Sequence, residues 1–177
     1  SVLVHRHDFF VRYIEEYHSG GKADHMKIAG LIATNLQNYP DNFALIDTIG
    51  EGAGVYSRLI ELGLTNAISC KFSHGAKGLR DITGVYEFSN MRAYLFWAVR
   101  DWLNPANNTG ACLPPNDRLM LEATSIKWSF RSDGKIFIEP KEDIKERIKK
   151  SIDVFDALAC SFYPTNDKSV ELDSIFF

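Results

Sequence analysis

The sequence of 177 residues lacks the features of several common classes of protein. It has only three cysteines, which are widely spaced and form no Cys-x-x-Cys pair and no cluster with histidines. Neither a disulfide framework nor a zinc site is supported, and we expect Cys70, Cys112 and Cys160 to be buried free thiols. No apolar run approaches the roughly 20 residues of a membrane-spanning helix, so no membrane partner is expected.

Signals for binding phosphate groups are also weak. No glycine-rich loop ends in Gly-Lys-Ser or Gly-Lys-Thr, so these residues contain no Walker-type ATPase site. The net charge is only −3. Residues 127–150 hold eight Lys and Arg against five Asp and Glu, whereas the rest of the chain holds 12 against 18. A basic segment on an acidic body would let one face alone meet nucleic acid, although such a bias also arises by chance.

The sequence does contain a regular succession of strand and helix patterns. A hydrophobic content of 45% suits one domain with a real core, and residues 1–177 show no boundary for a second domain. The succession predicts an α/β fold, in which helices flank a mixed sheet. In chain order we expect strands at 1–7 and 9–18, a helix at 22–39, a strand at 43–47, a helix at 55–62, a strand at 67–72, a polar loop at 73–84, helices at 91–103 and 117–123, a hairpin at 125–139, helices at 142–150 and 153–162, and a tail at 163–177.

The stretch from Phe43 to Gly54 carries the first candidate for chemistry. Its apolar run predicts a buried strand ending at Asp47, and three alternating glycines follow at positions 50, 52 and 54. In α/β sheets, ligands and catalytic groups gather at the C-terminal edge of the strands. The competing interpretation is structural: Asp47 caps the following helix, and the glycines only make a tight turn.

A cofactor loop is another interpretation of this turn. The turn is similar to the methyl-donor loop of class I methyltransferases, which reads Asp-x-Gly-x-Gly-x-Gly after a strand. Here one extra residue separates Asp47 from the first glycine, and the next predicted strand ends around Lys71, where that fold needs an acidic residue. A class I S-adenosylmethionine-dependent methyltransferase therefore stays an alternative function.

A late pair of carboxylates is the second candidate. Asp153 and Asp156 are three residues apart, so they share one face of the predicted helix in its first turn. Acidic residues at this position also stabilise a helix N-terminus without any further role. Together with Asp47, however, they would form a set of oxygen ligands suited to Mg²⁺ or Mn²⁺. Two such ions, about 3.5–4 Å apart, can support the hydrolysis of a phosphodiester.

The hairpin at 125–139, with Asp133-Gly134 at its turn, is the third candidate. Its basic face would contact phosphate groups, whereas the competing interpretation is an ordinary sheet edge protected by lysines. Apolar residues alternate with polar and basic ones along its first strand, as Ile126, Trp128 and Phe130 against Lys127, Ser129 and Arg131.

Four ordered stretches between residues 43 and 162 carry a family resemblance. They are Ile46-Asp47-Thr48-Ile49-Gly50-x-Gly52-Ala53-Gly54-Val55 with Arg58-Leu59-x-Glu61-Leu62-Gly63; Phe88-x-Asn90-x-Arg92-Ala93 with Trp97 and Arg100-Asp101; Gly134-Lys135-Ile136-x-Ile138-Glu139-x-Lys141-x-Asp143-Ile144-Lys145-x-Arg147; and Ser151-Ile152-Asp153-Val154-Phe155-Asp156-Ala157-Leu158. Together they resemble the nuclease domain of the large terminase subunit of tailed phages. The last motif of that family usually reads Ser-Pro-Asp-x-Ala-Asp-Ala-Leu, so this sequence departs from it at Ile152 and Phe155.

The resemblance implies an RNase H-like fold, with the hairpin at 125–139 added. It implies a metal-dependent DNA endonuclease that cuts concatemeric DNA with two ions, Mg²⁺ or Mn²⁺, and no other cofactor. Asp47 would be one ligand, and either member of the pair Asp153 and Asp156 would supply the last. The contacts that we expect with the DNA backbone are Lys71, Lys77, Arg80, Lys127, Arg131 and Lys135.

The resemblance also implies features outside these residues. The first strand of this fold carries the first catalytic aspartate, and residues 1–18 look like the hairpin that follows it. That strand is therefore expected before Ser1, and the chain without it is expected to lack a metal ligand and activity. The implied partners are double-stranded DNA, an N-terminal ATPase domain on the same polypeptide, the small terminase subunit and the portal protein, all in the host cytoplasm. A non-catalytic interaction module of the same fold is the remaining alternative.

Overall fold

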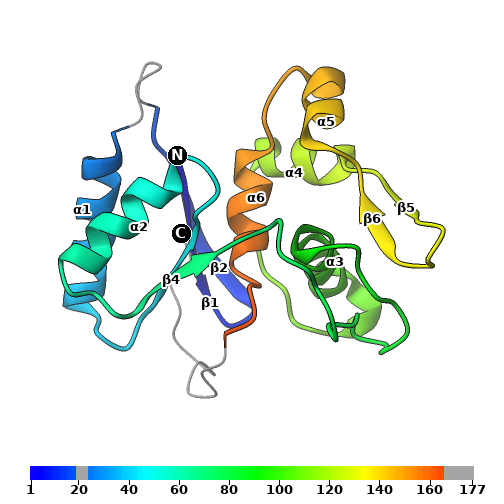
Figure 1. The fold of residues 1–177 in the computed structure, drawn as a ribbon, viewed down its shortest axis with the longest axis horizontal. Helices are drawn as coiled ribbons and strands as arrows, with labels where there is room; N and C mark the ends of the chain where they lie inside the picture. Colours follow the sequence, from blue (N-terminus) through cyan, green and yellow to red (C-terminus); the bar gives the residue numbers. More distant parts are fainter. Residues whose placement is uncertain (19–23, 166–177) are drawn as a thin grey trace.

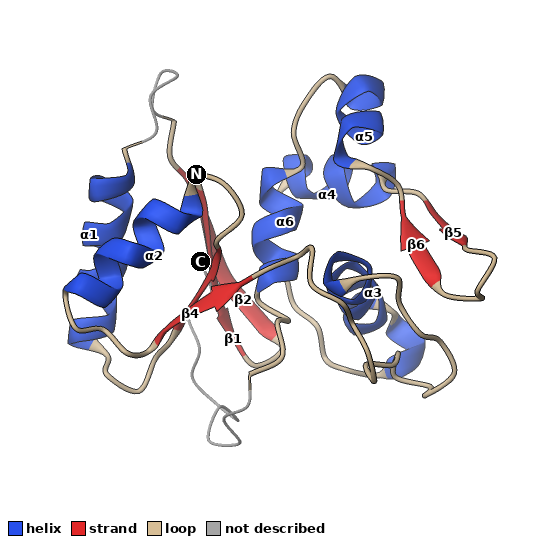
Figure 2. Cartoon of the chain, viewed as in Figure 1, coloured by secondary structure: helices blue, strands red, loops and turns tan. Residues whose placement is uncertain are grey.

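The computed structural model describes residues 1–18 and 24–165. A central group of strands has helices on both sides and is extended by further helices and a hairpin (Figures 1 and 2). The elements are β1 (Val2–His7), β2 (Phe10–Glu16), α1 (His25–Asn38), β3 (Ala44–Asp47), α2 (Gly52–Glu61), β4 (Ala67–Cys70), α3 (Met91–Leu103), the 3₁₀ helix η1 (Pro105–Asn107), α4 (Asp117–Ser125), β5 (Trp128–Phe130), β6 (Ile136–Ile138), α5 (Lys141–Ile148) and α6 (Asp153–Cys160). Among these elements, no helix is both long and apolar enough to cross a membrane.

The first four strands form two separate pairs. β1 and β2 are antiparallel, and Asp8 adopts a φ of 49° in the turn between them. β3 and β4 are parallel, with Ala44 opposite Ala67 at one end and Asp47 opposite Cys70 at the other. Within the described residues no strand joins β1 to β3, so the expected mixed sheet is present as two halves.

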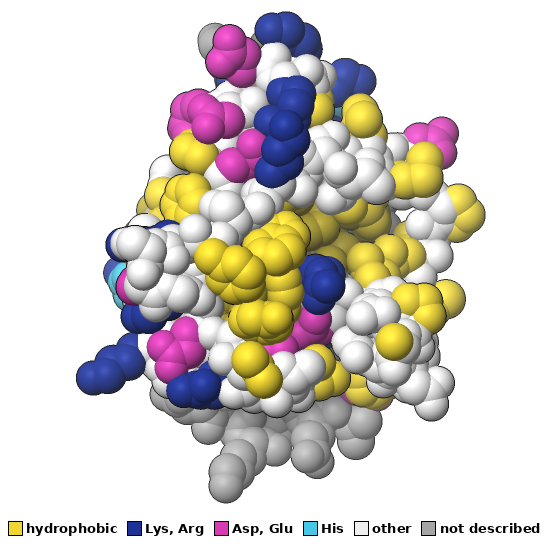
Figure 3. All heavy atoms as spheres, turned by 90° about the vertical axis from the view of Figure 1, so that its right-hand side faces the viewer, with side chains coloured by type: hydrophobic (Ala, Val, Ile, Leu, Met, Phe, Trp, Pro, Cys, Tyr) yellow, Lys and Arg dark blue, Asp and Glu magenta, His cyan; other side chains and the backbone are white. Residues whose placement is uncertain are grey.

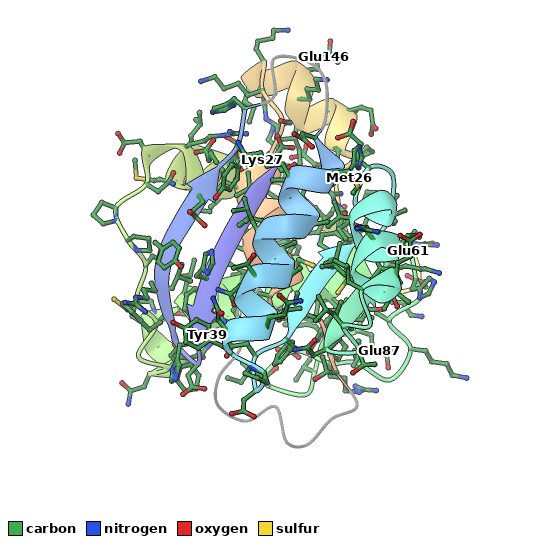
Figure 4. The ribbon with its side chains drawn as sticks, turned by 90° about the vertical axis from the view of Figure 1, so that its left-hand side faces the viewer. Met26, Lys27, Tyr39, Glu61, Glu87 and Glu146 are labelled. Carbon is green, nitrogen blue, oxygen red and sulfur yellow. The ribbon has the colours of Figure 1, made fainter. Side chains whose placement is uncertain are left out.

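Two hydrophobic cores lie on the opposite faces of these strands. Successive side chains of a strand point to opposite faces, and Leu3 of β1 and Ile46 of β3 join the core beneath α1 and α2. Val4 and Leu45, one position away, join the core formed with α3 and α6. The strands are therefore the middle of three layers. Figure 4 shows the outer layer from the side of α1, with Tyr39 at the end of that helix and Glu61 on α2.

The second group of elements is organised around α3. Asn90 caps this helix as predicted, since its side chain accepts a hydrogen bond of 2.9 Å from the backbone N–H of Ala93. The hairpin is attached to the segment before α3, because the N–H of Ser89 donates to the carbonyl of Ile136 and the N–H of Ile136 donates to the carbonyl of Glu87. The hairpin is therefore attached through β6 to the segment before α3, and β5 is its outer strand.

The structure corrects two local expectations. Cys112 is exposed rather than buried. This residue contacts the hairpin of β1 and β2 through its backbone: its N–H donates to the carbonyl of Phe9, and its carbonyl accepts from the N–H of Val11. Helix α2 begins at Gly52 rather than at residue 55, so two of the alternating glycines belong to its first turn. Residues 22–23 of the first expected helix and residues 166–177 of the expected tail lie outside the described residues.

Gly52 is required by the close approach of α2 to the end of β3. A Cβ at this position would lie 2.0 Å from the backbone carbonyl oxygen of Asp47, which cannot rotate away. We therefore expect Gly52→Ala to lower the free energy of unfolding by about 1–3 kcal/mol, because the helix or the strand must shift. Urea unfolding measures the change. Gly30→Ala, where the added Cβ meets nothing within 4 Å, is the control and should be neutral or stabilising; equal losses in both variants would contradict the close approach.

Candidate functional site

Asp47 is the last residue of β3, as predicted. Its Oδ1 accepts a hydrogen bond of 3.1 Å from the backbone N–H of Ile49, and Gly50, with a φ of 85°, turns the chain toward α2. Helix α2 has no side-chain cap, so the competing interpretation, in which Asp47 caps this helix, is wrong. Burial raises the pKa of the Asp47 carboxyl, while the bond from Ile49 and the charge of Lys141 oppose this rise.

The side chain of Asp156, on α6, lies close to that of Asp47. Its Oδ2 lies 2.6 Å from Nζ of Lys141, the first residue of α5. Its Oδ1 is buried and has no hydrogen-bond partner among the described residues. Burial raises the pKa of the Asp156 carboxyl; the ammonium of Lys141 opposes the rise, and the negative charge of Asp47 adds to it. The two carboxylates are therefore close enough to repel each other.

A cavity of about 390 Å³ opens beside these carboxylates. It lies between the two halves of the sheet, since β1 and β3 both line it, with α1 on one side and α6 on the other. Besides Ser1 and His25, its lining includes a set of carboxylates and one lysine: Asp47, Glu51, Lys141, Asp153 and Asp156.

Asp153 also lines this cavity, but its carboxylate already accepts hydrogen bonds from two other side chains. Its Oδ2 accepts hydrogen bonds from Oγ of Ser151 at 2.5 Å and from Nη2 of Arg118 at 3.3 Å. Its side chain is 56% exposed, against 15% for Asp156. Of the two carboxylates that the sequence left undecided, Asp156 is thus the one placed with Asp47 in a buried setting.

An ion pair that the sequence analysis missed holds the first turn of α6. Glu122, on α4, is almost fully buried and accepts hydrogen bonds from the backbone N–H of Phe155 at 2.8 Å and from Nε of Arg118 at 2.7 Å. Arg118 also donates to Glu16 at the end of β2. The only signal in the sequence was the spacing of four residues between Arg118 and Glu122, which is usual for exposed helix pairs. The pair fixes α6, and with it Asp156.

The basic residues expected to contact DNA fall into two groups that do not converge. Lys71 and Lys77 are exposed on the loop after β4, whereas Arg80 on that loop donates to Glu87 at 2.6 Å. The hairpin cations lie beyond α3 and α6, on the far side of the molecule from β4 (Figure 1). These are Lys127 and Arg131, both exposed, and the half-buried Lys135.

The donor set suits a divalent cation only in part. Carboxylate oxygens are the ligands that Mg²⁺ and Mn²⁺ prefer, and the partnerless Oδ1 of Asp156 is a buried acceptor without a donor. In the portion of the chain that is described, however, no group of three or more His, Cys, Asp or Glu side chains is placed to hold a metal ion. Two carboxylates beside a cavity therefore provide part of a metal site.

Comparison with known proteins identifies the fold. No family model and no curated protein matches the sequence. Among solved structures, the nuclease domain of the large terminase subunit gp2 of bacterial virus Sf6 has a TM-score of 0.65 at 22% identity, over 92% of this chain and 81% of that one. A mutant of that domain with manganese has a TM-score of 0.66 at 21% identity, over 91% and 82%. A mutant with calcium has a TM-score of 0.65 at 21% identity, over 91% and 81%.

The fold is RNase H-like. The expected fold class is thus confirmed, and so is the expected similarity to a terminase nuclease domain, which extends over nine-tenths of the chain. The separation of β1 from β3 does not prevent this match.

Removing the buried carboxylate on α4 should loosen α6. We expect Glu122→Ala to lower the free energy of unfolding by about 1–3 kcal/mol, because it leaves the N–H of Phe155 and Nε of Arg118 without an acceptor. Glu122→Gln can still accept the bond from Phe155 and should cost less. The matched control is Glu61→Ala, which breaks an exposed pair with Arg58 and should cost less than about 1 kcal/mol. Urea unfolding compares the three variants. Similar losses of stability in Glu122→Ala and Glu61→Ala would contradict the role of Glu122 in holding α6.

Proposed function

We propose that this chain is the nuclease domain of a viral DNA-packaging terminase, a metal-dependent endodeoxyribonuclease that cuts concatemeric DNA. The observation that carries the proposal is the convergence of Asp47 and Asp156, from β3 and α6, on one cavity, in a chain with the fold of a terminase nuclease domain. Two of those structures are of mutants with manganese or with calcium, and paired carboxylates favour such divalent cations.

Asp47 and Asp156 would hold the cations, and Asp153 would join them after release from Arg118. Bound at these carboxylates, two Mg²⁺ or Mn²⁺ ions would supply the Lewis acidity that phosphodiester hydrolysis needs. The raised pKa of each carboxyl follows from burial, so both groups favour a cation that replaces the lost solvation. The chain itself contributes a fixed pair of ligands and a cavity open to solvent.

A third carboxylate would come from an additional strand. The cavity lies between the edges of β1 and β3, and hydrophobic cores cover both faces of the strands around it. An extended segment between these edges would join the halves into one mixed sheet and bring a side chain from its end to Asp47. We propose that this segment precedes residue 1 in the same polypeptide, that residues 1–177 otherwise form one nuclease domain, and that an ATPase domain lies further upstream.

The partners follow from the same proposal. Double-stranded DNA would meet the loop after β4, where Lys71 and Lys77 are exposed next to the strand that pairs with β3. The small terminase subunit and the portal protein would be the protein partners, in the cytoplasm of an infected host. A methyltransferase is disfavoured by the next strand, because β4 ends at Cys70 and Lys71 follows it, where that fold needs an acidic residue.

Substitution of the carboxylates tests the nuclease activity. In a version of the chain extended upstream by one strand, Asp47→Asn and Asp156→Asn should each reduce Mn²⁺-dependent plasmid nicking at least about a hundredfold, because each removes a charged ligand. Asp153→Asn should have a smaller effect, since Arg118 holds that carboxylate.

Asp41→Asn, an exposed carboxylate before β3, serves as the control, and EDTA should abolish cleavage. Cleavage that persists in Asp47→Asn would overturn the site. If the extended chain folds but never cuts, the non-catalytic module of the same fold becomes the better interpretation. Binding of the methyl donor in calorimetry would favour the methyltransferase.

Lys141 provides a separate test of the metal site. Its ammonium lies 2.6 Å from Asp156 and so competes with any cation for that carboxylate. We expect Lys141→Ala to tighten Mn²⁺ binding by about tenfold in calorimetry, because it removes a positive charge from the site. Lys145→Ala, on the exposed side of the same helix, should leave the affinity unchanged. Weaker binding in Lys141→Ala would show that the lysine supports the site.

A further inference from the structure

The apolar face of β5 is not covered by the other described residues, 1–18 and 24–165. Trp128 is 46% exposed and Phe130 is 52% exposed, although both are large aromatic residues in a strand. They contact each other and extend a ring cluster that reaches Trp97 on α3, with 4.9 Å between the ring centroids of Trp97 and Trp128. In the face shown in Figure 3, hydrophobic side chains gather around a hollow. Exposed aromatic residues of this kind mark interaction sites.

A groove of about 510 Å³ lies next to this face, between α3, the end of α4 and the hairpin. Its wall is mostly apolar, and Arg100 is its only charged residue among those described. The guanidinium of Arg100 lies 4.3 Å from the ring centre of Trp97. The groove therefore suits a large apolar side chain, with a cation at its rim. Its other apolar lining residues include Phe96, Leu103, Ile126, Trp128 and Phe155.

The backbone of β5 is also open along its outer edge. The carbonyl of Lys127 accepts from the N–H of Glu139, and the N–H of Arg131 donates to the carbonyl of Lys135, so residues 127, 129 and 131 bond toward β6. In an antiparallel pair, the residues between these positions point their N–H and C=O groups the other way. The backbone groups of Trp128 and Phe130 therefore face outward, and among the described residues no strand other than β6 pairs with β5.

We propose that β5 is a docking edge for an extended segment of a partner protein, which pairs with the backbone of Trp128 and Phe130 and places a large apolar side chain in the groove. Strand addition supplies affinity through main-chain hydrogen bonds, and the pocket for alternate side chains supplies specificity. The groove shares no lining residue with the cavity at Asp47 and Asp156, so the inference does not depend on the proposed cleavage of DNA.

The charges around β5 determine which kind of strand can pair with it. In an antiparallel pair of two β5 strands centred on Ser129, Lys127 of one copy would lie opposite Arg131 of the other, and like charges directly opposite each other are destabilising. A second copy is therefore disfavoured. A partner strand that carries carboxylates at the matching positions would pair with Lys127 and Arg131 instead. The preferred ligand alternates acidic residues with large apolar ones, a pattern that a strand separates onto its two faces.

Synthetic peptides test this surface on the chain of residues 1–177. The probe is a blocked heptapeptide, Glu-Val-Glu-Trp-Glu-Val-Glu, compared with its Lys-for-Glu counterpart and with a scrambled peptide that lacks the alternation. We expect only the acidic alternating peptide to bind in calorimetry. On binding, amide exchange measured by NMR should slow at Trp128 and Phe130, with little change at Ser129, whose N–H already faces β6.

Two sets of variants distinguish strand pairing from nonspecific hydrophobic binding. Phe130→Pro removes the outward N–H, whereas Phe130→Ala keeps it, so the proline variant should bind about five- to tenfold more weakly than the alanine variant. The double variant Lys127→Glu with Arg131→Glu should prefer the Lys peptide. Equal binding by the two Phe130 variants, or no change in charge preference, would overturn the proposal. Self-association of the chain, seen by light scattering, would assign the edge to a second copy, and protection of the same amides by duplex DNA would assign the hairpin to nucleic acid.

Discussion

The site depends on keeping two half-buried carboxylates beside each other. Burial raises the pKa of Asp47 and of Asp156, and the charge of Asp47 raises that of Asp156 further, so the charged forms cost free energy without a nearby cation. Three features of the chain oppose this repulsion: the parallel pairing of β3 with β4, the contact of Gly52 with the end of β3, and the bond from Phe155 to Glu122 that fixes α6. Lys141 offsets part of the charge. We propose that a pair held this way binds a divalent cation.

The arrangement also explains how a divided sheet can persist. In the described residues, no strand pairing joins the halves β1–β2 and β3–β4, yet each half contributes to the same two cores. Leu3 and Ile46 pack beneath α1, while Val4 and Leu45 pack toward α6. The helices on either side therefore set the spacing of the strands. Because that burial is hydrophobic and not directional, it tolerates an open position between β1 and β3, and residues of both strands line the cavity there.

The features that the sequence predicted correctly are those that depend on residues close together in the chain. The hairpin of β1 and β2, the strand ending at Asp47 and the Asn90 cap depend on neighbouring residues, and patterns of apolar and turn-forming residues predicted them. The start of α2 was misplaced, because glycine is a poor helix former and only the contact at Gly52 justifies it there. Nothing local distinguishes Asp156 from Asp153, since the difference arises from Arg118, which is 35 residues away. The burial of Glu122 is equally a property of the packed fold.

The two ends of the domain carry opposite kinds of surface. On the side of Asp47, the loop after β4 presents the exposed lysines Lys71 and Lys77. At the hairpin, aromatic side chains and an open strand edge lie beside an apolar groove. Phosphate groups are attracted by charge and need no apolar pocket, whereas a groove of this size gains from burying carbon. The basic residues of the hairpin are therefore better explained as the polar side of a protein-docking strand than as an arm for DNA, and only the other end of the domain faces the carboxylates.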